Sequence, residues 1–486
     1  MLKALHSHDR TPLDDKALAT WVLIGFFYTS WMVYGAAFPD ITAPLLLWSA
    51  LTFILFLSAP LLPVKTLAGF ARTGRALFRD PLFYIWLALL MYVGVQWHNA
   101  WWIRFEPGEW VQWFDKDAPR PHWPSAVHAL DARLFFTQIA ASGVAVFALR
   151  HGLTTRASLR FFFAWLATGA FLLAVFGLIQ YASGTDYLYW YWPRTRHFFA
   201  SFFYENHAAQ YFYLSLSLAL GLATYQLCAR KMVASRRALN LWLITLATVF
   251  MAIVLSLSRT GIIFGIGLLI IGMIYMVRHF PDDLAPMIRL RFLVLLSAIC
   301  LSGLVWVSGT LGEDLKRDFV RTRPGQSLLE NAYAARVWQW EAAVDMWKTR
   351  PLFGVGTGGF AFFIPFYTPE PYIAALSKDH AGQTHNDALQ FLAEQGLVGI
   401  SLLIAWFVIL VAPLARSKTW NREWIWFPTL GLWLVLAHSL WDLPFRSPAV
   451  WFLWAVVAAS VGRFLKLPSL ATGDEVHNVM NKRGTT

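Results

Sequence analysis

The sequence has little charge and almost no cysteine. Charged residues make up 14% of its 486 residues, against about 25% in soluble domains, and hydrophobic residues make up 57%. A chain this apolar is neither disordered nor a nucleic-acid-binding domain, although its net charge is +12. The two cysteines, Cys228 and Cys300, lie in or beside apolar runs, so we interpret them as packing residues rather than a disulfide.

In place of charge the chain has long apolar runs. A membrane-spanning helix needs about 20 apolar residues, and stretches close to that length recur from end to end. They predict an all-α polytopic membrane protein that forms a single integral membrane domain over residues 1–486. The runs contain almost no ionisable side chain, which argues against an ion-coupled transporter. The predicted spans, about twelve, are 20–38, 43–62, 82–97, 134–149, 161–181, 207–228, 240–257, 260–277, 292–309, 396–414, 424–441 and 447–465.

Lys and Arg give the orientation. With the N-terminus placed inside, the segments that face the cytoplasm hold most of the 40 Lys and Arg, and the outer segments hold most of the 28 Asp and Glu. This positive-inside pattern predicts a multi-pass protein with both termini in the cytoplasm. Residues 467–486 are expected to form a flexible cytoplasmic tail.

The largest outer segment is a loop over residues 310–390, and loops this long are usually functional. Residues 331–349 within it contain no Gly or Pro and are followed by Arg350-Pro351. They predict a helix whose apolar side chains could lie along the bilayer surface. Because the spans are bare of ionisable groups, chemistry is sought on this outer side.

His385 is the first candidate, in the segment QTHNDAL just before the tenth apolar run. It is expected near the membrane surface and facing outward, with Asn386 beside it. An imidazole has an unperturbed pKa of about 6.5, which suits proton transfer near neutral pH. The alternative is a polar residue that merely begins a helix.

Two arginines and one polar patch complete the candidates. Arg259 lies in LSLSRTG, in a very short turn between two spans, and Arg336 lies on the predicted loop helix. A guanidinium can bind phosphate oxygens with two parallel N–H groups. The alternative for Arg259 is a cation that snorkels to the membrane interface, and the alternative for Arg336 is a solvated charge on a helix. The patch could hydrogen-bond sugar hydroxyls or equally cap a helix. It lies in FFYENHAAQYF and consists of Asn206, His207 and Gln210.

Two short patterns carry less weight. The run from Gly354 to Gly359 satisfies G-x-G-x-x-G, but a dinucleotide site needs a preceding strand, and a tight glycine turn is expected here instead. Asp115 and Asp117 have the D-x-D form that many sugar transferases use for a metal. A three-residue pattern is common by chance, so no metal site is predicted.

These motifs resemble the O-antigen ligase and polymerase superfamily of bacterial envelope glycosyltransferases. His385-Asn386, nine residues and then Gly396-Leu-Val-Gly399 is similar to the ligase signature. SLSRTG, AR-x-x-x-W and RPLFGVGTGGF follow in the family's order, and FFYENHAAQYF resembles its Asn-rich segment. The resemblance covers roughly residues 170–415. One departure is Trp340, where ligases often have Leu four residues after the loop arginine.

The resemblance implies about twelve helices with a large, partly helical periplasmic loop, a GT-C-like arrangement. It implies a metal-independent transfer, without cofactor, from an undecaprenyl-diphosphate-linked glycan at the periplasmic face of the bacterial inner membrane. His385 would be the general base, and Arg259 and Arg336 would clamp the diphosphate. Asn386 and Glu394 would sit in the supporting shell.

The first hypothesis is an O-antigen ligase that joins the glycan to lipid A-core oligosaccharide in lipopolysaccharide biosynthesis. A polymerase that lengthens an O-antigen or exopolysaccharide chain would use the same chemistry, with the growing glycan as acceptor. Attachment of glycan to a protein hydroxyl is a third alternative. From other classes come a lipid-linked glycan flippase or transporter, which the bare spans and large outer loop disfavour, and a structural membrane scaffold.

Overall fold

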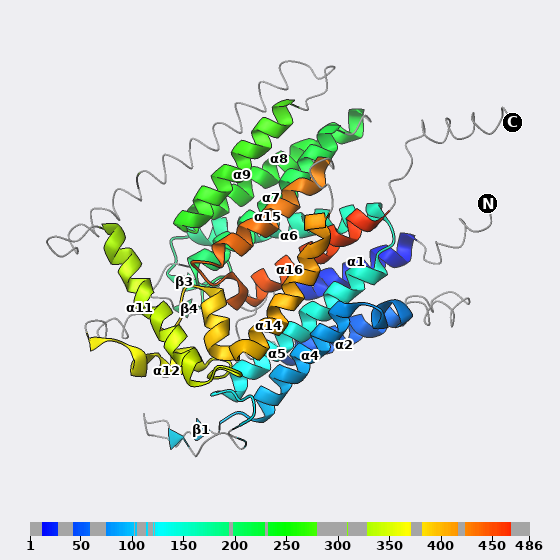
Figure 1. The fold of residues 1–486 in the computed structure, drawn as a ribbon. Coiled ribbons are helices and arrows are strands. Elements are labelled where there is room, and N and C mark those ends of the chain that lie inside the picture. Colours follow the sequence, from blue (N-terminus) through cyan, green and yellow to red (C-terminus); the bar gives the residue numbers. More distant parts are fainter. Residues whose placement is uncertain are drawn as a thin grey trace.

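The computed structural model describes residues 12–27, 42–58, 74–101, 103–104, 113–114, 120, 122–193, 198–228, 232–278, 309, 328–370, 382–416 and 423–467. Over these residues the chain is a bundle of helices (Figure 1). Its strands are two short antiparallel ladders, β1 (Ile103–Arg104) with β2 (Trp113–Phe114) and β3 (Tyr187–Leu188) with β4 (Trp192–Pro193). The predicted all-α polytopic membrane fold is confirmed.

Five of the described helices are long and apolar enough to cross a membrane, and three shorter apolar stretches accompany them. Each predicted span overlaps a described helix, except 292–309, which lies outside the described residues apart from Gly309. Residues 28–38 and 59–62, at the ends of the first two predicted spans, also lie outside the described residues. The helices of the bundle are α1 (Pro12–Phe27), α2 (Thr42–Ser58), α4 (Pro81–His98), α5 (Ala129–Phe147) with a π-helical end η6 (Ala148–Gly152), α6 (Arg156–Ala182), α7 (Glu205–Cys228), α8 (Met232–Leu255), α9 (Arg259–Arg278), α14 (Asp387–Arg416), α15 (Trp426–His438) after a short 3₁₀ turn η9 (Glu423–Ile425), and α16 (Pro448–Lys466).

Several helices begin where the sequence supplies a cap. Asp80 and Ser447 each precede a proline at the first helical position, and their side chains accept hydrogen bonds from Leu82 N and Val450 N. Thr155 caps α6 in the same way through Ser158 N. These side chains satisfy amide groups that a helix start leaves without an intrahelical partner, and the prolines cost nothing there.

Helix α7 lies at the centre of the bundle. It is buried along most of its length and packs against α6, α8, α9 and α15. Its polar side chains Ser215 and Ser217 donate to carbonyls of their own helix, so they bury no unpaired hydroxyl. Gly431 of α15 faces Ser217 so closely that a Cβ there would collide with it. This close approach packs the middle of α15 against the middle of α7.

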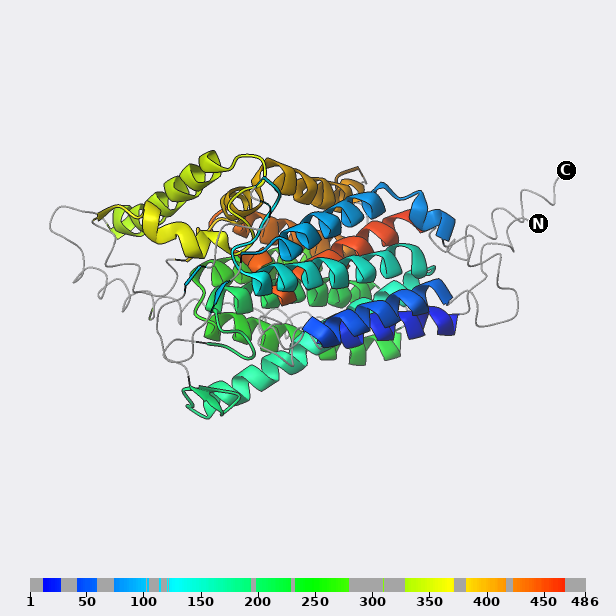
Figure 2. The same ribbon diagram turned by 90° about the horizontal axis from the view of Figure 1, so that it is seen from below.

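A second, smaller core lies at one end of the bundle. It joins α11 (Leu328–Thr349), α12 (Gly359–Tyr367) and the start of α14, and it contains Trp338, Met346 and Phe360. The apolar face of α11, for which the sequence suggested the bilayer surface, is therefore used for packing inside the protein. Figures 1 and 2 show α11 and α12 at one end, while the start of α1 and the end of α16 point toward the other.

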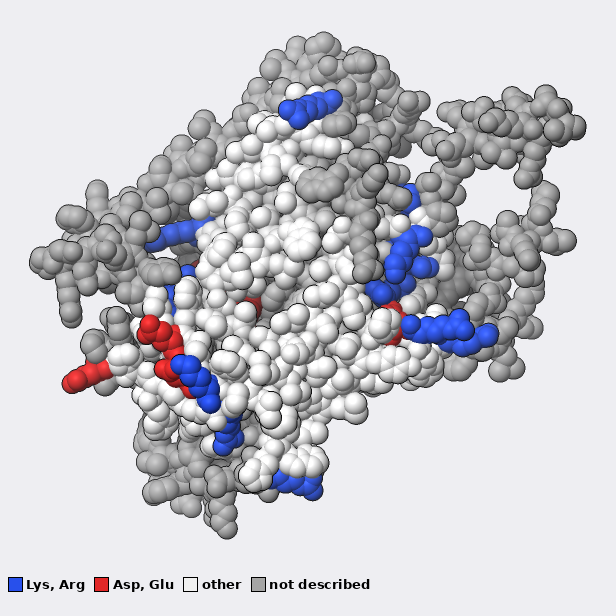
Figure 3. Space-filling view, in the orientation of Figure 1, with Lys and Arg blue, Asp and Glu red and all other residues white. Residues whose placement is uncertain are grey.

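The opposite end is held by arginines. Arg150 donates to the Asp80 carboxylate at 2.5 Å, and His151 lies 2.8 Å from the same group. Arg156 donates to the carbonyl of Leu467, and Arg463 to that of Leu153. On the face drawn in Figure 3 the charged side chains lie mostly along the margins, with a broad uncharged area between them, as a membrane-embedded surface requires.

Asp80→Ala should lower the thermal stability of the protein in detergent. The change removes the cap of α4 and leaves Arg150, whose side chain is 14% exposed, without its carboxylate. A loss of about 1–3 kcal/mol is expected, measured as a fall in the unfolding temperature. The matched control is Asp345→Ala, which removes an exposed pair with Lys348 and should change stability by less than about 1 kcal/mol. Equal effects of the two variants would contradict this assignment.

Candidate functional site

The turn that follows α15 carries a buried carboxylate. The predicted span 424–441 is longer than the helix, which ends at His438, because residues 439–443 turn back ahead of Pro444 and the 3₁₀ turn η10 (Pro444–Arg446). The Asp442 side chain on this turn is 1% exposed. Its oxygens accept hydrogen bonds from the Tyr204 hydroxyl at 3.1 Å and from the Gln210 amide at 3.2 Å.

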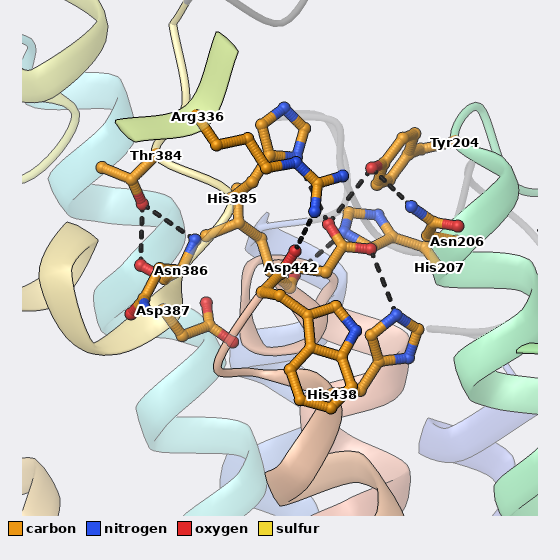
Figure 4. A network of polar contacts seen from close by, with 12 residues as sticks. Tyr204, Asn206, His207, Arg336, Thr384, His385, Asn386, Asp387, His438 and Asp442 are labelled. Atoms are coloured by element: carbon orange, nitrogen blue, oxygen red, sulfur yellow. Dashed lines mark hydrogen bonds and ion pairs between the residues drawn. The ribbon is translucent and has the colours of Figure 1, made fainter. Parts of the chain in front are cut away.

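Two histidines flank the same carboxylate. His385 Nδ1 lies 3.5 Å from one oxygen of Asp442, and His438 Nε2 lies 3.6 Å from the other. Figure 4 shows the side chains from α7, α11, the start of α14 and the end of α15 gathered around Asp442. A carboxylate beside Nδ1 favours the proton on that nitrogen and leaves Nε2 as the acceptor. This is the arrangement a general base requires.

The backbone at His385 is strained. Its φ is +51°, a left-handed conformation that is uncommon for a residue with a side chain. Such residues gather at functional sites and persist only where their surroundings hold them. Here Trp340 of α11 donates its indole N–H to the carbonyl of Thr384 at 2.9 Å, and the Thr384 amide donates to Gln390.

A buried glutamate stands behind this segment. Glu394 is fully buried and accepts hydrogen bonds from Gln390 at 2.7 Å and from Arg446 at 2.5 Å. Through Gln390 it supports the amide of Thr384, one residue before His385. These contacts of Glu394 are with protein side chains. They favour the predicted supporting role over a direct contact with substrate.

Asn386 and Asp387 attach the start of α14 to the Asp442 turn. The Asn386 side chain caps the helix by accepting from Leu389 N at 3.0 Å, and its amide donates to Leu440 O at 2.9 Å. The Asp387 carboxylate accepts from Phe445 N at 3.1 Å. Asn386 and Asp387 thus help to hold the backbone that carries His385 against the Asp442 turn.

Arg336 reaches the same turn, and its Nη1 donates to the carbonyl of Trp441 at 3.0 Å, next to Asp442. The arginine is partly buried, so it is not the freely solvated helix charge that was the alternative. Arg259 is exposed at the first residue of α9. The preceding Ser258 donates to Asn206 at 2.5 Å, which holds the start of α9 against the start of α7.

The polar patch of α7 also contacts the protein. Asn206 donates to the Tyr204 hydroxyl and accepts from Ser258, and His207 Nε2 lies 3.0 Å from Leu443 O. Gln210 donates to Asp442. These contacts bring the predicted patch to the His385 site, and they favour a role in positioning the Asp442 turn over a direct grip on sugar hydroxyls.

The glycines of the signature have a structural role. At Gly396, φ is +60° and the backbone of α14 leaves the helix for one residue. Ala393 and Glu394 carbonyls then accept from Val355 N and Gly356 N, while Leu397 N and Val398 N donate to Pro351 and Leu352 carbonyls. The expected tight glycine turn after α11 is confirmed: Gly354, Gly356 and Gly358 all have positive φ. It docks onto the break in α14 and satisfies its backbone groups.

The network sets the charge state of Asp442. Burial raises the pKa of the Asp442 carboxyl, but the close approach of His385 and of the other nearby histidines outweighs it, so this pKa lies below its ordinary value of 3.8. Burial and the Asp442 charge both raise the pKa of Tyr204 well above 10.0. Asp442 is therefore ionised and Tyr204 neutral at physiological pH.

Sequence reasoning missed Asp442, Tyr204, His438 and the contact of Trp340. The sequence does contain a signal for Asp442: it is an acidic residue in a short turn between two predicted spans, just as Arg259 is a basic residue in such a turn. Within the described residues no group of three or more His, Cys, Asp or Glu could hold a metal ion, and Asp115 and Asp117 lie outside them.

Fold and site together define a multi-pass membrane protein with a histidine–carboxylate centre at one end of its helix bundle. Residues 244–404 match the family model described as O-Antigen ligase. This segment contains Arg259, Arg336 and His385, and the match confirms the resemblance to the O-antigen ligase and polymerase superfamily. No curated protein gives a significant match.

Acid should destabilise the protein through Asp442. Because its folded pKa lies below 3.8, the ionised group contributes stability above about pH 4, and this contribution is lost as the pH falls through the folded value. The unfolding temperature should therefore fall as the pH is lowered from 5 to 3, and Asp442→Asn should show a shallower fall. Parallel pH curves for the two proteins would show that Asp442 is not stabilised as an anion.

Proposed function

We propose that the chain is an inverting, metal-independent glycosyltransferase that moves a glycan from undecaprenyl diphosphate to lipid A-core oligosaccharide at the periplasmic face of the bacterial inner membrane. The observation that carries the proposal is the contact of His385 with the buried Asp442, with Arg336 on the adjacent carbonyl. The family match supports a glycosyltransferase of this superfamily.

His385 acts as the general base. Asp442 holds the proton of His385 on Nδ1, so Nε2 takes the proton of the acceptor hydroxyl as its oxygen bonds to the anomeric carbon. General-base assistance of this kind contributes about 10²–10⁴-fold. The strained backbone of His385 and its supporting contacts hold the imidazole in place before substrate arrives.

The arginines stabilise the leaving group. The bond between the anomeric carbon and the diphosphate oxygen breaks, and its electron pair leaves with the lipid diphosphate. Arg259 and Arg336 meet the negative charge that grows on this group. Arg336 keeps one N–H on Trp441 O, so the rest of its guanidinium serves the phosphate oxygens. One displacement inverts the anomeric centre and needs neither metal nor covalent intermediate.

A polymerase of the same superfamily is the second candidate. The observation that favours it is Trp340, where ligases often have Leu, since this residue contacts the carbonyl of Thr384 beside the base. The glycan donor and the roles of His385 and the arginines would be unchanged. The acceptor would be the end of a second lipid-linked chain instead of lipid A-core.

His385→Ala should abolish transfer while the protein still inserts and melts cooperatively, and Arg336→Lys should also fail because a forked donor becomes a point charge. The assay reconstitutes the protein with an undecaprenyl-diphosphate glycan and offers lipid A-core or no acceptor. Product on lipid A-core supports the ligase, and longer carrier-linked chains support the polymerase. Movement of donor across the bilayer without any glycosidic product would instead support a flippase. Full activity of His385→Ala would reject the base.

Trp340→Phe should lower the transfer rate by about 2–10-fold, because the ring is retained but one hydrogen bond to Thr384 O is lost. Trp347→Phe is the matched control: Trp347 also lies on α11 and donates to a carbonyl, that of Pro351, away from His385. It should retain wild-type activity. If both variants behave alike, the indole of Trp340 has no special part in holding the His385 segment.

A further inference from the structure

A cavity of about 380 Å³ lies next to the segment that carries His385. Its described lining residues come from α2, α5, α12, α14, the first residue of α16 and the turns before α12, α14 and α16, and none belongs to α7, α9 or α11. Clefts of this size bind small ligands. Two lining residues connect it to the site: Gln383 lies two residues before His385, and Phe445 donates its amide to Asp387.

Polar groups with free bonding capacity line one part of the wall. No hydrogen bond or ion pair joins the Asp131 carboxylate to another residue of the described chain. Gly358, with φ of +75°, makes room for it, since a Cβ at this position would collide with the carboxylate. Gln138 uses its amide nitrogen on Phe445 O, which leaves its oxygen as an acceptor.

Aromatic rings form another part of the wall. Phe135 and Phe391 lie with their ring centroids 6.0 Å apart and their planes 24° from parallel. Arg446 also lines the cavity, and its Nη2 donates to the buried carboxylate of Glu394. A carboxylate, amides and ring faces suit an uncharged sugar, whose hydroxyls donate while its C–H faces pack on aromatic rings. The negative charge of Asp131 would repel a phosphate.

The geometry of the displacement indicates whether the cavity binds the donor sugar or the acceptor sugar. In a single displacement with inversion, the attacking oxygen and the departing diphosphate lie on opposite faces of the anomeric carbon. The arginines proposed for the diphosphate lie on α9 and α11, and the cavity is lined from other helices. We infer that this cavity binds the acceptor sugar that carries the attacking hydroxyl, with Asp131 accepting hydrogen bonds from its other hydroxyls. The inference rests on the proposed function.

Asp131→Asn tests the inference in the reconstituted, full-length protein. It should raise the acceptor KM by about 10–100-fold, because a charged hydrogen-bond acceptor is lost, and leave the donor KM and the rate at saturating acceptor near wild type. Both acceptors are measured, lipid A-core and a second undecaprenyl-diphosphate glycan, and the one whose KM rises identifies the source of the sugar. Asp345→Asn, an exposed aspartate on α11, is the matched control and should change nothing.

Ala361→Trp is an independent second variant, because Ala361 lines the same cavity and a large ring there fills it. It should also raise the acceptor KM and spare the donor KM, at an unchanged unfolding temperature. An unchanged acceptor KM in both variants, or a rise in the donor KM instead, would overturn the acceptor assignment while wild-type transfer still upheld the proposed function. Absence of transfer by the wild-type protein to either acceptor would overturn the proposed function itself.

Discussion

A carboxylate withdrawn from water needs donors on every side, and the end of the bundle near α11 supplies them to Asp442. A buried charge without partners costs far more than a helical turn or a salt bridge contributes. Tyr204 and Gln210 from the α7 segment donate to Asp442, and His385 and His438 lie against it. Three separate parts of the chain must therefore come together before the charge is stable: the α7 segment, the His385 segment and the end of α15 with its turn. The contacts that satisfy Asp442 are thus the same contacts that position the imidazole of His385.

The same requirement explains why so many polar residues near the site contact protein. Asn206, His207 and Asn386 are chemically suited to bind a glycan, yet each bonds to the chain around Asp442. They keep a strained His385 where it is. Free bonding capacity is found instead at Asp131 and Gln138, in a cavity whose wall is partly aromatic. The site thus has two distinct parts: polar residues that hold the His385 imidazole, and the nearby cavity in which Asp131 and Gln138 have acceptor oxygens available.

Much of the fold was predictable because apolar length alone defines a membrane helix, and Asp80-Pro81 and Ser447-Pro448 mark helix starts in the sequence itself. His385, Arg259 and Arg336 could be selected as candidates because polar groups stand out against apolar surroundings, and their proposed roles stay predictions. Asp442 could be noticed in its short turn between two spans, but its role could not be predicted, because that role depends on Tyr204 and Gln210, more than 200 residues away. The packing of α11 was also missed, since a helix that is apolar on one face reads alike whether it meets lipid or protein.

The glycine turn at residues 354–358 also limits how the site can open. Four main-chain hydrogen bonds join residues 351–356 to α14 on both sides of Gly396, so this stretch is held firmly against a membrane-spanning helix. Lifting it like a lid would break all four bonds and expose the backbone groups that the break in α14 leaves unpaired. A lipid-linked substrate that slides in from the bilayer, between helices, avoids that cost. The break in α14 therefore favours lateral entry of the substrate between helices over entry by displacement of residues 351–356.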